Sequence, residues 1–150
     1  MENMDQAQAA RVWQRVRGNA PENEEITLQQ LIDWEWEACQ GYLHLSRRCG
    51  GRMSDALLRM SQEERSHCAC LRGMLLLTGG KPGPLPNVAQ SREPFEVILR
   101  GSYEKEMQSI RAYDERSADP TYGHVFRSMR DQEQAHSRTV LELLGAFDKK

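Results

Sequence analysis

Apolar side chains recur at intervals of three and four residues along four long stretches of the chain. This spacing places them on one face of an α-helix. It predicts four helices, over residues 27–49, 54–78, 93–116 and 121–144. Because each helix carries a single apolar stripe, we expect the four stripes to face one another in an all-α protein with one shared core.

Residues with capping and stop preferences support these helix limits. Thr27, followed three residues later by Gln30, matches a capping box at the start of the first helix. Glycine pairs at 50–51 and 79–80 end the first and second helices, and Gly145 ends the fourth. The four stretches are therefore separate helices.

The connections between the helices predict the topology. The loops at Gly50 and at Asp119 are short, so each of them joins two antiparallel helices. The connection over residues 81–91 is rich in proline and long enough to cross the bundle. We predict an antiparallel four-helix bundle with a long crossover between its second and third helices.

A further amphipathic pattern precedes the bundle. Residues 5–17 place apolar side chains on one face and end at Gly18, and a polar, acidic stretch follows at 19–25. We expect this short extra helix to dock on the bundle or on a second subunit. The predicted division is an N-terminal helix and linker at residues 1–20 and one bundle domain at residues 21–150.

Two of the apolar stripes contain a Glu and a His three residues apart, where leucine would be expected. The second helix carries the stripe Leu57, Met60, Glu64, His67, Leu71 and Met74. The fourth carries Tyr122, Phe126, Met129, Glu133, His136, Val140 and Leu143. A buried charge without a partner costs several kcal/mol, so these pairs require a compensating cation, and a metal ion is the simplest one.

The first and third helices each add one inward carboxylate. Glu35 and Glu106 lie on apolar stripes, whereas Glu37 lies on another face and should be solvated, and Glu104 falls off the stripe and is the reserve choice on the third helix. In each half of the chain a Tyr follows this Glu by seven residues, and a Glu-x-x-His motif follows on the next helix. The two halves therefore repeat the same helical hairpin.

Six inward side chains thus meet at one level of the bundle. The predicted metal ligands are Glu35, Glu64, His67, Glu106, Glu133 and His136. Carboxylates can bridge two hard cations, and imidazole adds a neutral ligand that suits iron. We predict a centre of two metal ions bridged by Glu64 and Glu133, with iron as the first choice and manganese or a mixed pair as alternatives.

With these motifs the chain resembles a ferritin-like di-iron protein of the rubrerythrin family that lacks a rubredoxin domain. The resemblance rests on Glu35…Tyr42, residues 64–67, Glu106…Tyr113 and residues 133–136, and it spans residues 27–144. It implies that the iron centre reacts with hydrogen peroxide or dioxygen while Fe(II) is oxidised. It also implies that Tyr42 and Tyr113 lie next to the metal ligands.

The chain departs from the rubrerythrin pattern at Ser109, where that family carries a further carboxylate. The six-ligand set therefore resembles that of bacterioferritin-type centres. No cysteine cluster is present for an attached electron-transfer centre, so a separate donor, such as a rubredoxin-type protein, would supply electrons. A large storage shell is not expected, because little chain follows Gly145 to form a further helix, and we expect a homodimer.

Composition narrows the classes of partner. The formal net charge is −2 and the basic residues are scattered among acids, so we expect no nucleic-acid binding. No apolar run approaches the roughly 20 residues that span a bilayer, and the start lacks a signal-peptide core, so we expect a cytoplasmic protein without a membrane association. The four cysteines form no C-x-x-C pair and should be reduced thiols.

Three functions remain open on these observations. The first is an oxidoreductase, a peroxidase or ferroxidase that reduces hydrogen peroxide or dioxygen. The second is a metal-binding, iron-handling module in which iron oxidation serves sequestration. The third is a di-iron hydroxylase of an organic substrate, which would require an apolar pocket beside the metals.

Overall fold

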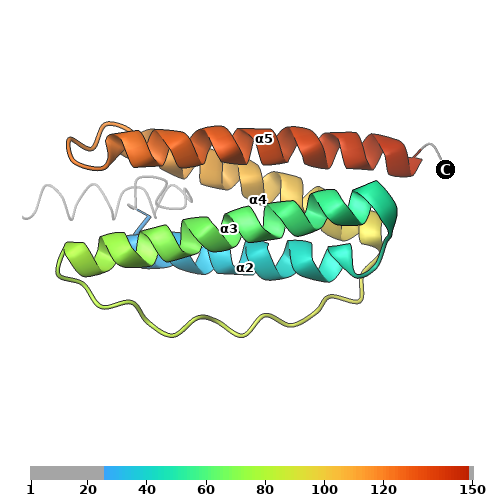
Figure 1. The fold of residues 1–150 in the computed structure, drawn as a ribbon, viewed down its shortest axis with the longest axis horizontal. Helices are drawn as coiled ribbons and strands as arrows, with labels where there is room; N and C mark the ends of the chain where they lie inside the picture. The colour runs from blue at the N-terminus through green and yellow to red at the C-terminus, as the bar shows by residue number, and fades with distance from the viewer. Residues whose placement is uncertain (1–25, 149–150) are drawn as a thin grey trace, which may run out of the picture.

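The computed structural model describes residues 26–148 of the chain and contains four helices within them (Figure 1). These are α2 (Leu28–Ser46), α3 (Gly51–Leu77), α4 (Phe95–Arg116) and α5 (Gly123–Asp148). The helix predicted over residues 5–17 lies outside the described residues. None of the helices between residues 26 and 148 combines the length and apolar character that crossing a membrane needs.

The helices form two antiparallel hairpins, α2 with α3 and α4 with α5, which pack side by side (Figure 1). The crossover from α3 to α4 runs the length of α2 on the outside of the bundle. Two hydrogen bonds hold the crossover against α2, one from Gly83 N to Gln29 Oε1 (2.8 Å) and one from Trp36 Nε1 to Pro86 O (3.1 Å). The predicted topology, including the long crossover, is confirmed.

The helix limits follow the predicted caps at some ends and differ at others. Thr27 and Gln30 form the predicted capping box of α2. However, α2 already ends at Ser46, because the Ser54 hydroxyl donates a 2.7 Å hydrogen bond to Ser46 O and closes that end. Accordingly α3 begins at Gly51 rather than at residue 54, and Gly51 adopts φ +60°, which favours glycine.

The fourth helix differs most from the prediction. It begins at Gly123, since the Asp119 carboxylate accepts hydrogen bonds from the backbone N–H groups of Thr121 (2.9 Å) and Tyr122 (2.6 Å) in the preceding turn. It continues through Gly145 to Asp148, so the prediction of a stop at Gly145 was wrong. The last turn is held by packing, because the Phe147 ring stacks on Phe95 with ring centroids 5.7 Å apart.

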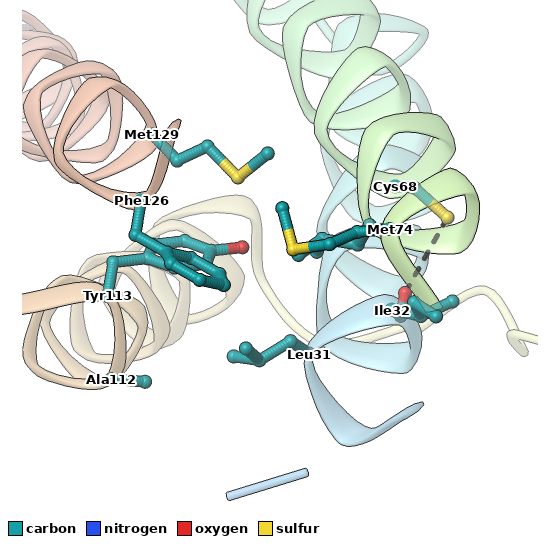
Figure 2. Close-up of a cluster of buried hydrophobic side chains, with 9 residues drawn as sticks. Leu31, Ile32, Cys68, Met74, Ala112, Tyr113, Phe126 and Met129 are labelled. Carbon is teal, nitrogen blue, oxygen red and sulfur yellow. Dashed lines mark hydrogen bonds between the residues drawn. The ribbon is translucent and has the colours of Figure 1, made fainter. Parts of the chain in front are cut away.

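Two apolar clusters fill the bundle on either side of a polar layer. One comprises Leu31, Ile32, Cys68, Leu71, Met74, Ala112, Tyr113, Phe126 and Met129, and Figure 2 shows it. The other comprises Tyr42, Leu45, Leu57, Met60, Phe95, Leu99 and Val140. These clusters shield the layer between them from water along the bundle axis, which strengthens electrostatic interactions inside that layer.

Candidate metal centre

The polar layer consists of the six side chains that the sequence predicts as metal ligands. Glu35 comes from α2, Glu64 and His67 from α3, Glu106 from α4, and Glu133 and His136 from α5. None of the six is more than 4% exposed. Each helix thus delivers its polar residues to the same level, as the interrupted stripes predict, while Glu37 and Glu104 are exposed.

The six residues form two overlapping groups of potential ligands. In the first group, ligand atoms of Glu35, Glu64, His67 and Glu133 all lie within 4.8 Å of one another. In the second group the same holds for Glu64, Glu106, Glu133 and His136. Glu64 and Glu133 belong to both groups, which is the position that the predicted bridging ligands require. Each group then adds one terminal carboxylate and one imidazole.

The unpaired atoms of the layer fit a pair of cations. All four carboxylate oxygens of Glu64 and Glu133 are buried and have no hydrogen-bond partner among the described residues. Burial, together with the charges of Glu35 and Glu106, raises the pKa of both carboxyl groups well above the usual value. Two divalent cations would neutralise the four carboxylates and give these oxygens partners, so the donor set fits a dinuclear metal site.

Both imidazoles direct Nδ1 into the carboxylate layer. His67 Nδ1 lies 2.7 Å from Glu35 Oε1 and 3.2 Å from Glu64 Oε1. His136 Nδ1 lies 3.1 Å from Glu133 Oε1 and 3.3 Å from Glu106 Oε2. Nδ1 is therefore the atom of each ring that is placed to bind a metal ion.

Without a metal, the carboxylates favour the protonated form of both rings. Burial alone would lower the pKa of His67, but the hydrogen bond and charge of Glu35, with the charge of Glu133, outweigh burial and raise it to about 9. Burial likewise opposes protonation of His136, but Glu106, Glu133 and Glu64 raise its pKa above the usual value. A proton on each Nδ1 thus occupies the position that a cation would take.

The opposite nitrogen of each ring is held by the other half of the chain. His67 Nε2 donates to Gln132 Oε1, and His136 Nε2 donates to Glu63 Oε1 at 2.6 Å. Such a partner fixes the orientation and tautomer of a ligating imidazole. Sequence analysis missed both residues, although the repeat carries a signal for them, since each immediately precedes a bridging Glu. The two partners differ in charge, because Glu63 offers a carboxylate to His136 whereas Gln132 offers a neutral amide to His67.

Tyr42 and Tyr113 both lie beside the polar layer, but their hydroxyl groups differ in hydrogen bonding. The Tyr42 hydroxyl donates a 2.6 Å hydrogen bond to Glu106 Oε2, and this bond joins the first half of the repeat to the second. The Tyr113 hydroxyl is buried and has no hydrogen-bond partner among the residues that the structure describes. Burial raises the pKa of both phenols, and the nearby carboxylates, Glu106 for Tyr42 and Glu35 for Tyr113, raise it further. Both hydroxyls therefore remain protonated at neutral pH.

Comparison with known proteins identifies the fold. No protein-family model matches the chain, and neither does any curated protein. Among solved structures, the bacterioferritin of Rhodobacter capsulatus matches with a TM-score of 0.67 and 19% sequence identity, over 81% of this chain and 83% of that one. That structure has a metal-free dinuclear site and a haem iron in a crystallographic special position. The chain has the ferritin-like four-helix bundle fold.

The donor atoms of the polar layer determine which metal ions this ferritin-like bundle can bind. Its hard oxygen donors and two neutral nitrogens suit iron and manganese, whose oxidation states can change without loss of the ligands. The apolar clusters on either side shield these side chains along the bundle axis, and the four helices fix their spacing. The four-helix bundle therefore offers a buried set of donors that fits a pair of metal ions.

Proposed function

We propose that the protein is a di-iron oxidoreductase that oxidises Fe(II) with hydrogen peroxide or dioxygen as electron acceptor. The observation that carries this proposal is the pair of buried ligand groups that share Glu64 and Glu133. A structural bundle would bury leucines at these positions, because a carboxylate without a partner destabilises a core. The ferritin-like fold supports the same conclusion.

The ligand roles follow from the two groups. Glu64 and Glu133 would be shared by the two irons, and each iron would be held in addition by one carboxylate, from Glu35 or Glu106, and by one imidazole, from His67 or His136. When bound, the iron pair would supply Lewis acidity and two electrons, and two electrons with two protons suffice to convert one hydrogen peroxide molecule into two water molecules. Tyr42 holds the Glu106 carboxylate in place through its 2.6 Å hydrogen bond.

A rubrerythrin-like peroxidase is the finer form of this proposal. It requires a reductant to return the iron to Fe(II), and a separate rubredoxin-type protein is our candidate, in a homodimeric, cytoplasmic enzyme. Steady consumption of peroxide in the presence of a reductant supports this form. A single burst of about one peroxide per iron pair, without further turnover, contradicts it.

Iron handling is the second candidate, favoured by the structural similarity to a bacterioferritin. In that case iron oxidation leads to storage or transfer, and the bundle takes up more iron than its two ligand groups hold. Aerobic titration with Fe(II) separates the candidates. Uptake that ends at two irons per chain favours the oxidoreductase, and uptake well beyond two favours iron handling.

The first experiment is metal analysis of protein loaded anaerobically with Fe(II). We expect two irons per chain for the parent protein and fewer for the Glu64→Ala variant, because that change removes a ligand from both groups. Glu37→Ala is the matched control, a Glu on α2 that is exposed, and it should retain two irons. Zero or one iron in the parent, unchanged by Glu64→Ala, would refute the proposed centre.

A further inference from the structure

A cavity of about 390 Å³ lies between α2 and α4, beside the end of the crossover. Residues of α2, α4 and the crossover line it, and among the described residues no side chain of α3 or α5 contributes. Since α3 and α5 carry both histidines, the cavity approaches the candidate metal centre from the side opposite the imidazoles. Its volume lies within the range of small-molecule sites in proteins.

The inner end of the cavity reaches the ligand layer itself. Tyr42 and Glu106, which are joined by the 2.6 Å hydrogen bond, both line it, and Ser109 lies one turn after Glu106 on α4. The Ser109 side chain is buried and forms no hydrogen bond within residues 26–148, so its hydroxyl is available to a bound molecule. A ligand here would therefore meet polar groups at its inner end.

The side walls are mainly apolar, and the charged groups that line the cavity are mostly acidic, which disfavours an anionic ligand. Trp34 and Ala38 contribute from α2, and Val97 and Ile98 contribute from α4. Lys105, Glu37 and Glu93 line the cavity but are exposed to solvent, whereas Glu106 is the buried charged group of the lining. Apolar walls with a few polar groups at one end are typical of sites for uncharged organic molecules.

Two glycines in helix interiors keep this cavity wide. Gly41 lies within α2 and Gly101 within α4, and both line the cavity. A glycine within a helix destabilises it by roughly 0.5–1 kcal/mol relative to alanine. Neither glycine is required by the backbone, because neither has positive φ and a Cβ at either position would meet no atom within 4 Å. Both positions leave open space in which a side chain would otherwise stand.

We propose that this cavity is a binding site for a small, uncharged, mainly apolar organic molecule that carries one hydroxyl group. The hydroxyl lies at the inner end, near Ser109 and the Tyr42–Glu106 pair, and the apolar part packs against Trp34, Val97 and Ile98. The site places an organic molecule directly against a terminal ligand of the candidate metal centre. Binding requires no metal, so it can be tested independently of the proposed redox activity.

The test is calorimetric titration of the full-length, metal-free protein with 1-naphthol, which has two apolar rings and one hydroxyl. We expect one binding site per chain. Gly101→Leu fills the cavity from α4 and should weaken binding at least tenfold. Gly145→Leu is the matched control, an exposed helical glycine with equally open space on α5, and it should bind as the parent does.

Three further variants keep the test decisive if leucine disturbs the fold. Gly41→Ala and Gly101→Ala should each weaken 1-naphthol binding while raising thermal stability, because alanine favours the helix. Ser109→Ala should weaken binding several-fold through the loss of one hydrogen bond. Absence of binding by the parent up to the solubility limit of 1-naphthol, or equal affinity in the parent and the Gly101 variants, would overturn the proposal.

Discussion

The two tyrosines allow the hydrogen bonding of the metal-free centre to be tested with one matched pair of substitutions. Tyr42 and Tyr113 occupy equivalent places in the repeat, and both are at most 2% exposed. Tyr42 donates a 2.6 Å hydrogen bond to Glu106, whereas the Tyr113 hydroxyl has no hydrogen-bond partner within residues 26–148. Replacing either by phenylalanine removes one oxygen and leaves the packing of the ring unchanged.

The expected effects differ because only one substitution breaks a hydrogen bond. A hydrogen bond to a charged group contributes about 1.5–3 kcal/mol, so Tyr42→Phe should lower the free energy of unfolding by that amount. Tyr113→Phe removes a buried hydroxyl that is already unpaired, so its effect should lie between zero and a slight stabilisation. For a chain of this length, the first change corresponds to a fall in Tm of about 3–12 °C.

The assay is urea unfolding of the metal-free protein at neutral pH, followed by helical circular dichroism. Parent and variants should share one m-value, so that a shift in the midpoint reports stability alone. Equal destabilisation by the two substitutions, or a larger loss for Tyr113→Phe, would show that the two hydroxyls are equivalent in solution. The asymmetry argued from the structure would then be wrong.

Three further predictions address the cap, the metal affinity and the pH dependence. Thr27→Ala removes the side-chain half of the α2 capping box and should lower the free energy of unfolding by about 1 kcal/mol in a urea titration; an unchanged midpoint would contradict this. Glu63→Ala removes the hydrogen-bond partner of His136 Nε2 and should weaken Fe(II) binding about 10–100-fold in an anaerobic titration. Glu63→Gln can still accept that hydrogen bond, so it should restore Fe(II) binding. Equal losses of affinity in both variants would exclude an orienting role for Glu63. Because the folded pKa of His67 is raised to about 9, its proton stabilises the metal-free fold below pH 6.5, and this contribution is lost as the pH rises through 9. Tm measured against pH should therefore fall across this window for metal-free protein, and His67→Gln should reduce the slope; an unchanged slope in that variant would contradict the assignment.

Much of the fold was predictable because the governing interactions are local. The apolar spacing predicted four helices, and Thr27 and Gln30 predicted the first cap, since both depend on residues three or four apart. The limits that failed depend on contacts between distant residues. Ser54 closes the end of α2 from another helix, and Phe147 extends α5 past Gly145 by stacking on Phe95.

The convergence of the six predicted ligand residues was also predictable, since their inward orientation follows from helical period alone. The stripes predicted that Glu35, Glu64 and Glu133, among others, lie at one level, and the structure brings them together. The partners of the imidazoles were not predicted. Gln132 and Glu63 lie off the stripes, and their contact with the histidines depends on how far the two hairpins are rotated against each other.

The sequence by itself therefore determined which face of each helix is buried and which polar side chains enter the core. Periodicity encodes this information, because side-chain direction along a helix repeats every 3.6 residues. Only the tertiary structure decided that Tyr42 reaches Glu106, that the Tyr113 hydroxyl finds no partner in the described part of the chain, and that a cavity opens between α2 and α4. These features depend on the axial offset and separation of helices that are distant in the chain, and shifts of about 1 Å make or break a hydrogen bond.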